Sequence, residues 1–374
     1  MPTYQMAKPH IGKAEIDAVK RVLESGVLSL GPKHREFEQA LAKRIGTKYA
    51  ASVSNGTAGL HLAMIAAGIG PGDEVITTPF SFVASANSIL FVGAKPIFVD
   101  IDPVTYNLDP RYIEEAITKK TKAILAVHIF GQGADMDPIM KIARKHKLIV
   151  LEDACESLGA TYKGKKLGTF GQSSVFAFYA NKQITTGEGG MVCTNSKRVY
   201  DLSKSLSNQG RSGNMQWLDH ARLGYNYRLN EMSAALGVEQ LKKLDFLIQE
   251  RKKIARWYSK YLKKYSKLVQ IPRVGKYNTH TWQVYVTKIL RRDVNRDRLI
   301  ENLAKCGISS KPYLPSIHLF SFYRKQFGYK PGSYPIAEDL SRYSLALPFY
   351  IGLKENDVKH ISNQFISAIE EYKK

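Results

Sequence analysis

Short apolar runs and helical periodicities alternate through the first half of the chain. The apolar runs predict strands at residues 48–54, 74–78, 95–99, 123–129, 148–152, 175–178 and 191–194. Between them, the spacing of apolar positions predicts helices at residues 58–67, 82–92, 110–117 and 137–146. Because strands and helices alternate, we expect a mostly parallel sheet of about seven strands covered by helices on both sides.

The flanking segments extend this pattern at both ends. Helical spacing predicts two early helices at residues 13–25 and 34–45, then further helices at residues 230–243 and 241–265. Beyond residue 280 the pattern changes to a strand at residues 282–290 and helices at residues 296–306, 337–344 and 355–372. The chain is therefore predicted to have a large α/β domain, residues 1–245, and a smaller C-terminal α+β domain, residues 246–374.

The net charge makes nucleic acid a partner to consider, whereas the composition argues against disulfides, a metal site and a membrane. The 374 residues carry 55 Lys and Arg against 33 Asp and Glu, a net charge of +22, with eleven basic and two acidic residues between positions 242 and 273. Without a recognition motif, we interpret these charges as the solvated face of a helix, so nucleic acid is an unlikely partner, whereas an anionic small molecule would benefit from the field. Three scattered cysteines indicate neither a disulfide framework nor a metal site, and without a long apolar run we expect a cytoplasmic protein with no membrane association.

Lys182 is the first candidate for chemistry. It follows an apolar run and precedes a glycine-rich turn, in the stretch FAFYANKQITTGEGGMVCT. The ε-amine of a lysine at a strand exit can form a Schiff base with an aldehyde cofactor. The glycines that follow would let such a cofactor approach the backbone. Alone, Lys182 would be interpreted as a surface residue before a hairpin.

Three further features are predicted at the carboxyl ends of the strands, where open α/β sheets bind ligands. Gly56 and Thr57 begin a helix and could hold a phosphate, although an ordinary helix cap fits the same pattern. Asp153 ends a strand and could keep a pyridine nitrogen protonated, or simply cap a helix. Phe82 could stack on a flat ring or belong to the core.

Together these motifs resemble the pyridoxal-phosphate aminotransferases of the DegT/StrS type, which make amino sugars on nucleotide carriers. The resemblance covers nearly the whole chain and is carried by SNGTAGLHLA, GDEVITTPFSFVAS, FVDIDPVTYNLD, HIFGQGADMDPI, EDACES, FYANKQITTGEGG, LGYNYRLNEMSAALG and KPYLPSIHL. It implies the type I aminotransferase fold, with a seven-stranded sheet and a small C-terminal domain, and pyridoxal 5′-phosphate as the cofactor.

The resemblance also implies a role for individual residues. Lys182 corresponds to the lysine that binds the cofactor and moves the proton, and Asp153 to the partner of the pyridine nitrogen. The other implied cofactor contacts are the phosphate cup of Gly56 and Thr57, the stacking ring of Phe82, Glu156 near the ring hydroxyl where relatives commonly have Gln or His, and Asn226, reaching the phosphate from a neighbouring subunit of a homodimer.

One position departs from the family pattern. Many relatives carry a phosphate-binding serine five residues before the lysine, where this chain has Ala177. Ser174 or a water molecule could compensate, or the cofactor could bind less tightly. Relatives that act as dehydratases replace the lysine with histidine, so Lys182 favours amine transfer.

By this resemblance, the expected reaction moves an amino group from glutamate or glutamine to a nucleotide-linked keto-sugar in two half-reactions. Candidate substrate-binding residues are Arg211, Lys311, Tyr313 and His318. The TTGEGG and GYNYRL motifs favour carbon 4 of the sugar. The alternatives are transfer at carbon 3 or to a keto-cyclitol, and, from another class, a non-catalytic cofactor-binding regulator that holds nucleic acid on its basic surface.

Overall fold

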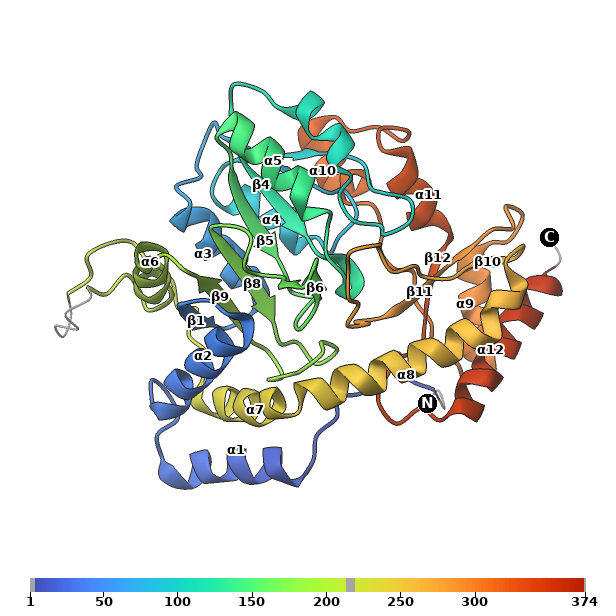
Figure 1. The fold of residues 1–374 in the computed structure, drawn as a ribbon, viewed down its shortest axis with the longest axis horizontal. Coiled ribbons are helices and arrows are strands. Elements are labelled where there is room, and N and C mark those ends of the chain that lie inside the picture. The colour runs from blue at the N-terminus through green and yellow to red at the C-terminus, as the bar shows by residue number, and fades with distance from the viewer. Residues whose placement is uncertain (1–3, 213–218, 373–374) are drawn as a thin grey trace.

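A seven-stranded sheet forms the centre of the larger part of the molecule in the computed structural model, which describes residues 4–212 and 219–372 (Figure 1). The strand order is β1-β9-β8-β5-β4-β2-β3. The strands are β1 (Tyr49–Val53), β2 (Glu74–Thr77), β3 (Lys95–Phe98), β4 (Thr121–Val127), β5 (Ile149–Asp153), β8 (Ser173–Ala177) and β9 (Gly190–Thr194). Each of the seven strands predicted from the apolar runs is present.

All strands of the sheet are parallel except β9, which runs antiparallel to both neighbours. The carboxyl ends of the six other strands therefore share one edge of the sheet, which is where ligands bind in this architecture. A two-stranded hairpin, β6 (Thr161–Tyr162) and β7 (Lys165–Lys166), lies outside the sheet.

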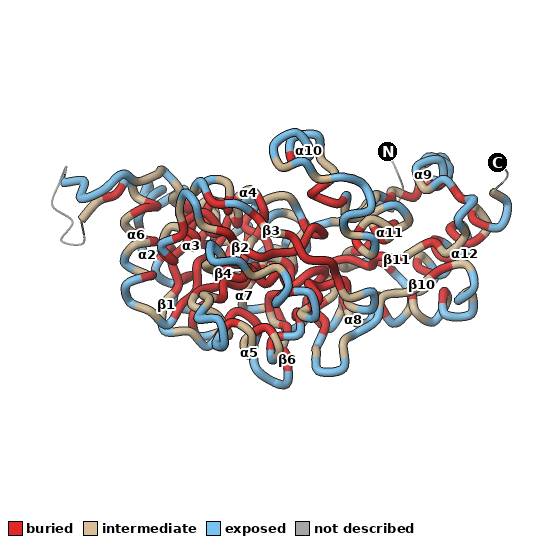
Figure 2. The backbone as a smooth tube through the Cα atoms, turned by 90° about the horizontal axis from the view of Figure 1, so that it is seen from above, coloured by how far each residue is buried: buried red, intermediate tan, exposed pale blue. Residues whose placement is uncertain are grey.

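Side chains alternate between two buried layers along each strand, as the two-residue repeat of a strand requires. In β8, Val175 packs against the core beneath α3, whereas the adjacent Phe176 packs against the core beneath α2. One face is covered by α3 (Gly56–Ala66), α4 (Ala84–Phe91) and α6 (Lys197–Ser207), and the other by α2 (Pro32–Ile45), α5 (Met136–His146) and α7 (Glu231–Lys242). Helix α1 (Lys13–Ser25) packs on the outside of α7. Figure 2 shows the buried strands between more exposed helices.

One predicted helix of the large domain is wrong. Residues 110–117 form two separate 3-10 turns, Pro110–Tyr112 and Glu114–Ala116, instead of one α-helix. Asp109 accepts the N–H of Arg111 and starts the first turn, and the chain returns to extended backbone at Ile117. The apolar spacing of eight residues was too short to distinguish two turns from a helix.

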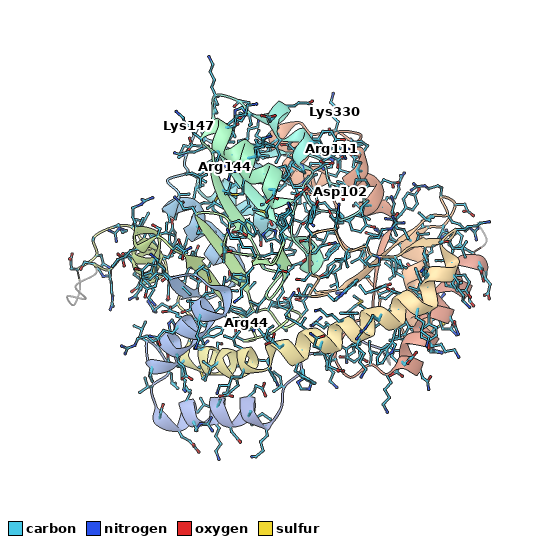
Figure 3. The ribbon with its side chains drawn as sticks, in the orientation of Figure 1. Arg44, Asp102, Arg111, Arg144, Lys147 and Lys330 are labelled. Carbon is cyan, nitrogen blue, oxygen red and sulfur yellow. The ribbon has the colours of Figure 1, made fainter. Side chains whose placement is uncertain are left out.

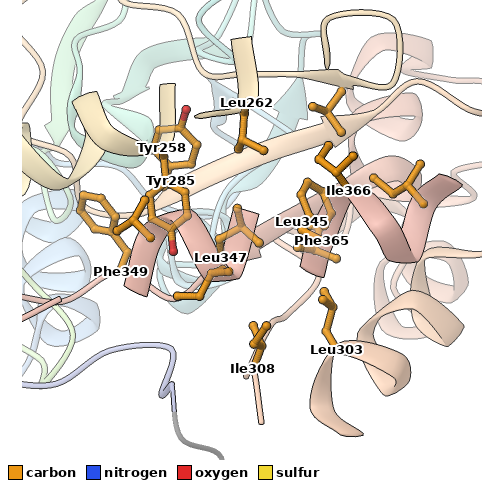
Figure 4. Packing of buried hydrophobic residues seen from close by; sticks show 14 of the residues in the cluster. Tyr258, Leu262, Tyr285, Leu303, Ile308, Leu345, Leu347, Phe349, Phe365 and Ile366 are labelled. Atoms are coloured by element: carbon orange, nitrogen blue, oxygen red, sulfur yellow. The ribbon is translucent and has the colours of Figure 1, made fainter. Parts of the chain in front are cut away.

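The smaller unit is built on a three-stranded antiparallel sheet in the order β10-β11-β12. Its strands are β10 (Val269–Gln270), β11 (Tyr285–Ile289) and β12 (Ser344–Leu347), and its helices are α9 (Arg296–Lys305), α10 (Ser321–Phe327), α11 (Pro335–Tyr343) and α12 (Glu355–Glu370). Tyr258, Tyr285 and Phe349 pack together with aliphatic side chains in its core (Figure 4). This α+β arrangement agrees with the predicted fold class.

Helix α8 (Leu244–Leu262) joins the two units. Its first turns place Leu244, Leu247 and Ile248 in the core of the large sheet. Its later turns place Ile254 and Tyr258 in the core of the small sheet. The division of the chain at residues 245 and 246 stays a prediction, since one continuous helix contributes to both cores.

The first described residues pair with the small unit. The N–H of Tyr4 donates to the carbonyl of Gly307, and the carbonyl of Tyr4 accepts the N–H of Ser309, each at 2.9 Å. The N–H of Phe349 donates to the carbonyl of Met6. Residues 4–6 therefore lie beside the C-terminal part of the molecule, as Figure 1 shows.

Glu38 is a buried acid that fastens α2 to the sheet. Its carboxylate accepts the N–H of Ser52 at 2.8 Å and pairs with Lys204 of α6 at 2.8 Å. Burial opposes ionisation, but the hydrogen bond with His34 and the charge of Lys204 lower the pKa of Glu38 to about 2. The acid is therefore ionised at neutral pH and links three elements.

The excess of basic side chains is distributed over separate elements. Figure 3 labels Arg144 in the last turn of α5, Lys147 directly after that helix, Lys330 after α10, and Arg111, which pairs with Asp109. The first three are exposed. Within residues 4–212 and 219–372, no helix has the length and low charge that crossing a bilayer requires.

Candidate active site

A cavity of about 710 Å³ opens at the shared carboxyl edge of the parallel strands. The loops that follow β1, β2, β4, β5 and β8 all contribute to its wall, together with a segment from the smaller unit. Eight of the twelve residues expected to bind cofactor or substrate line this cavity: Gly56, Thr57, Phe82, Asp153, Glu156, Lys182, Lys311 and Tyr313.

Lys182 stands in the loop after β8 and points at Glu156. Its Nζ lies 3.2 Å from Oε1 of Glu156, and both side chains are nearly withdrawn from solvent. The other carboxylate oxygen of Glu156 accepts the N–H of Phe130 at 2.9 Å. Glu156 is thus held from the far side, and its free edge faces the lysine.

The surroundings of Lys182 favour its charged form. Burial alone lowers the pKa of this amine, but the negative potentials of Glu156, Tyr313 and Cys155 outweigh it and raise the pKa above its ordinary value. The Tyr313 hydroxyl is affected by the same cluster: burial, with a further contribution from Glu156, raises its pKa to about 12. The lysine is therefore an ammonium ion held in place before any cofactor reacts with it.

Asp153 ends β5 and is aligned by two donors. The hydroxyl of Ser85 donates to Oδ2 at 2.6 Å, and the N–H of Cys155 donates to Oδ1 at 3.2 Å. The side chain is buried at the cavity wall. A carboxylate held in this way can accept a hydrogen bond from a protonated ring nitrogen, and Ser85, which the sequence reasoning missed, orients it.

The first turn of α3 forms a narrow cradle. Asn55 caps the helix by accepting the N–H of Ala58 at 2.8 Å, while the earlier N–H groups of a first turn have no partner inside the helix. A Cβ added at Gly56 would lie only 2.7 Å from the Cβ of Ala177 and 3.1 Å from Sγ of Cys155. The absence of a side chain at Gly56 leaves the backbone open to a phosphate.

The remaining lining residues supply a ring and a cation. Phe82 is 61% exposed, so its ring is available at the cavity wall instead of being used in the core. Lys311 and Tyr313 arrive from the smaller unit, through a segment whose residue 311 pairs with Ala346 of β12. Both units therefore shape this cavity.

The four other predicted site residues lie elsewhere in this chain. The hydroxyl of Ser174 donates to the carbonyl of Gly168 at 2.8 Å and does not reach the cavity, so this arrangement gives no support to the expected compensation for Ala177. His318 is buried and its ring pairs with Glu338 at 2.9 Å. Asn226 is exposed, and Arg211 lines a separate cleft between α2 and α6.

A second buried pair that sequence reasoning missed supports the end of β5. Nε2 of His128, which lines the cavity, lies 3.0 Å from Oε2 of Glu152, and Nδ1 of His128 accepts the N–H of Ala134. Glu152 also accepts three backbone N–H groups, from Gly168, Phe170 and Gly171. Although burial opposes ionisation, the His128 hydrogen bond and these donors lower the pKa of Glu152. The sequence signal that could have revealed this pair is a polar residue near the end of each of two apolar runs, His128 in residues 123–129 and Glu152 in residues 148–152.

The geometry fits pyridoxal 5′-phosphate. An amine, an aligned carboxylate, an exposed ring and a glycine cradle at a helix start surround one cavity of suitable size. Over the described part of the chain, no three His, Cys, Asp or Glu side chains gather as metal ligands.

Comparison with known proteins gives the same answer. The model of the DegT/DnrJ/EryC1/StrS aminotransferase family matches residues 9–366. GDP-perosamine synthase of Caulobacter vibrioides is 39% identical over 363 residues, covering 96% of this chain and 97% of that protein.

Two solved structures have the same fold. The aminotransferase PseC of Helicobacter pylori, involved in the biosynthesis of pseudoaminic acid, superimposes with a TM-score of 0.93 at 30% identity, covering 99% of this chain and all of that one. The PLP form of the putative sugar aminotransferase Spr1654 of Streptococcus pneumoniae superimposes with a TM-score of 0.92 at 28% identity, covering 98% of each chain.

Proposed function

Because this chain belongs to the DegT/DnrJ/EryC1/StrS aminotransferase family and is a pyridoxal-phosphate-dependent transaminase, we propose that it aminates carbon 4 of a nucleotide-linked keto-sugar. Action on sugar nucleotides follows from its relatives, among them GDP-perosamine synthase. The position of transfer and the amino donor, glutamate or glutamine, are the parts we add. The TTGEGG and GYNYRL motifs support carbon 4.

One observation carries the catalytic assignment: Lys182 and Asp153 converge on the same cavity from the ends of adjacent strands. A structural role would need neither a buried amine nor a carboxylate aligned by Ser85. Because the chain belongs to an aminotransferase family, we set aside the alternative of a non-catalytic regulator.

The residues divide the work between proton transfer and binding. Pyridoxal phosphate, when bound, supplies an electron-withdrawing ring that stabilises negative charge on the donor's α-carbon. Lys182 is placed to bind the cofactor and, once displaced, to move a proton to and from the reacting carbon atoms. Asp153 keeps the ring nitrogen protonated, and the first turn of α3 holds the phosphate.

Substrate recognition is proposed to involve the cations and aromatic side chains at the cavity wall. Lys311 is exposed and can neutralise a diphosphate, while Tyr313 offers a hydroxyl and a ring beside Glu156 and Lys182. The net charge of +22 attracts an anionic substrate over a longer range.

A homodimer with shared active sites is part of the proposal. Asn226 is exposed and lies outside the cavity of its own chain, as a residue that serves a neighbouring site would. Exposed apolar side chains along and after α1, including Ile16, Leu23 and Leu28, offer surface that a second copy would cover. The division into a large domain, residues 1–245, and a small domain, residues 246–374, is likewise part of the proposal.

The test is to convert the enzyme to its amine-loaded form and add keto-sugar nucleotides one at a time. A panel would combine GDP, UDP and dTDP carriers with keto groups at carbon 4 or carbon 3, plus a keto-cyclitol. We expect a 4-keto sugar nucleotide to restore the aldehyde absorbance and give an amino sugar by mass spectrometry. Restoration only by a 3-keto sugar or a cyclitol would overturn the carbon-4 assignment while leaving the transaminase intact.

A further inference from the structure

The loop that carries Lys182 is held by residues from outside the large sheet. The carbonyl of Asn181 accepts Nε2 of Gln283 at 2.6 Å. The carbonyl of Lys182 itself accepts Nη2 of Arg251, from α8, at 3.3 Å. Consecutive peptide groups of the loop are therefore fixed by α8 and by the segment directly before β11.

The side chain of Gln183 adds a third attachment on the other side of Lys182. Its Nε2 donates to the carbonyl of Glu156 and, at 3.0 Å, to the hydroxyl of Thr281. Glu156 is the partner of the Lys182 amine, so this contact also fixes the position of that carboxylate relative to the loop.

Arg251 is the centre of these contacts. Its Nη1 donates to the carbonyls of Trp282 and Gln283, each at 3.2 Å, so a single guanidinium bridges the lysine loop and segment 282–283. The side chain is buried, and among the described residues it has no carboxylate partner and no acceptor at Nε. Burial lowers the pKa of Arg251 to about 10.

Three carbonyl dipoles and the Phe349 ring, whose centroid lies 5.8 Å from Cζ, compensate this buried cation. Without a carboxylate partner the burial is still costly, and an apolar side chain of similar size would normally serve packing better. What the guanidinium provides that such a side chain does not is a rigid set of donors aimed at three carbonyls. One of those carbonyls belongs to the residue whose amine must reach two different reacting carbons. Small displacements of such a group reduce rates strongly.

We propose that Arg251 is a positioning residue, which fixes the backbone of Lys182 to α8 and to segment 282–283. Gln283 assists by holding Asn181. The proposal rests on the proposed catalytic role of Lys182, but the restraint itself exists whether or not Lys182 is catalytic, and the two can be measured separately.

The experiment compares Arg251→Met and Gln283→Leu with Tyr258→Phe. Tyr258 is on the same helix and donates a buried hydrogen bond to the carbonyl of Pro348, in the small core, so its loss is a matched control that does not touch the loop.

The first measurement is hydrogen–deuterium exchange of cofactor-free protein in the peptide covering residues 179–187, where the N–H groups of Lys182 and Thr186 are hydrogen-bonded. Both test variants should exchange there at least about 10-fold faster than the native protein, because the opening of the loop becomes easier. Tyr258→Phe should not.

The second measurement is the steady-state rate with α-deuterated and ordinary amino donor. Arg251→Met should lower kcat by about 10-fold to 100-fold and increase the isotope effect, with KM for the donor changed by less than about 3-fold, since proton transfer by a displaced amine becomes slower. If Arg251→Met does not fold, Gln283→Leu carries both measurements with a smaller effect.

Exchange in residues 179–187 that stays native in both variants, or rises equally in Tyr258→Phe, would overturn the proposal. Faster exchange with unchanged kcat and isotope effect would also overturn it, since the restraint would then have no consequence for the reaction. If instead Lys182→Ala proved fully active, the catalytic assignment would fail while the exchange result would stand.

Discussion

The ammonium of Lys182 lies 3.2 Å from Oε1 of Glu156, whose second oxygen is fixed by the N–H of Phe130. Both side chains line the cavity and are nearly withdrawn from solvent. A lysine must lose its proton before it can attack an aldehyde, so Glu156 stabilises the unreactive form of the free amine. Glu156 therefore positions the Lys182 amine and also makes its reaction with pyridoxal phosphate depend on loss of a proton.

Replacing Lys182 with alanine should abolish turnover. We expect the rate of amino transfer to fall by at least about 10³-fold, because one side chain supplies both the bond to the cofactor and the acid–base function. The visible absorbance of the lysine–cofactor linkage should disappear as well. Full activity of the variant with a keto-sugar nucleotide would show that another residue moves the proton.

Replacing Glu156 with glutamine should let the empty enzyme capture pyridoxal phosphate at lower pH. The native pair raises the pKa of Lys182 above its ordinary value, so the amine stays protonated through neutral pH and becomes free only as the pH rises past that raised pKa. Without the negative charge, the pH profile of capture should move downward by about 1–3 units. Because this range lies below the raised pKa, stopped-flow absorbance between pH 6 and pH 10 would measure the shift as a rate of capture about 10-fold to 10³-fold higher than that of the native enzyme at each pH.

Glu188→Gln is the control for this experiment. Glu188 lines the same cavity but is exposed, and no hydrogen bond joins its carboxylate to Lys182 among the described contacts. Its profile should remain native. An equal shift in both variants would indicate a general charge effect instead of the specific pair.

Replacing Asp153 with asparagine should lower kcat by about 10²-fold or more, since an amide cannot keep the ring nitrogen protonated. The substitution keeps the size of the side chain and can keep the hydrogen bond from Ser85. Ser85→Ala, which removes only the orienting donor, should have a smaller effect. Steady-state rates with saturating donor would rank the two variants, and the opposite ranking would contradict this assignment.

Ala177→Ser should tighten binding of the cofactor. Ala177 lines the cavity beside Gly56, so a hydroxyl there could donate to the phosphate, and one such hydrogen bond contributes about 1 kcal/mol, or roughly 5-fold in Kd. Ser174→Ala is the matched control, because the Ser174 hydroxyl is already bonded to Gly168. Fluorescence titration of both variants with pyridoxal phosphate would show whether Ala177 weakens binding of the cofactor phosphate.

Replacing Glu38 with glutamine should flatten the acid limb of the stability profile. The folded-state pKa of Glu38 is lowered from 4.5 to about 2, so its contribution to the free energy of unfolding is present above pH 4.5 and is lost as the pH falls toward 2. At pH 7 the variant should lose about 1–3 kcal/mol, because the buried N–H of Ser52 and the half-buried ammonium of Lys204 lose a charged acceptor. Urea unfolding at several pH values would measure both effects.

Glu36→Gln provides the comparison on the same helix. The side chain of Glu36 is 45% exposed, and within the described part of the chain its one ion pair is with Lys33. The variant should therefore change stability by less than about 0.5 kcal/mol at any pH. A similar loss in both variants would contradict the special role of Glu38.

The central sheet could be predicted from the sequence because its strands are buried on both faces. Strongly apolar runs such as residues 123–129 are typical of strands covered on both sides. Runs of this kind also place Asp153 and Lys182 at strand ends without further information. The short strands of the smaller unit were less visible. Residues 344–347, Ser-Leu-Ala-Leu, have no β-branched member and were partly assigned to a helix, yet pairing with β11 makes them a strand.

The supporting residues of the site could not be predicted in the same way. Ser85, His128 and Arg251 act on residues that are 68, 24 and 69 positions away in the sequence, and nothing in their local pattern indicates those partners. Local periodicity reports which face of an element is buried, whereas these contacts depend on how loops meet in three dimensions. Only the folded structure shows them.

The pairing of residues 4–6 with residues 307–309 and 349 has a consequence for the order in which the protein can be made. Translation delivers residues 4–6 long before the others, so their backbone groups stay without their final hydrogen-bond partners while about three hundred further residues emerge. The last steps of assembly therefore include the pairing of residues 4–6 with these later segments, and a ribosome that stalls within α9 releases a product in which the pairing cannot form.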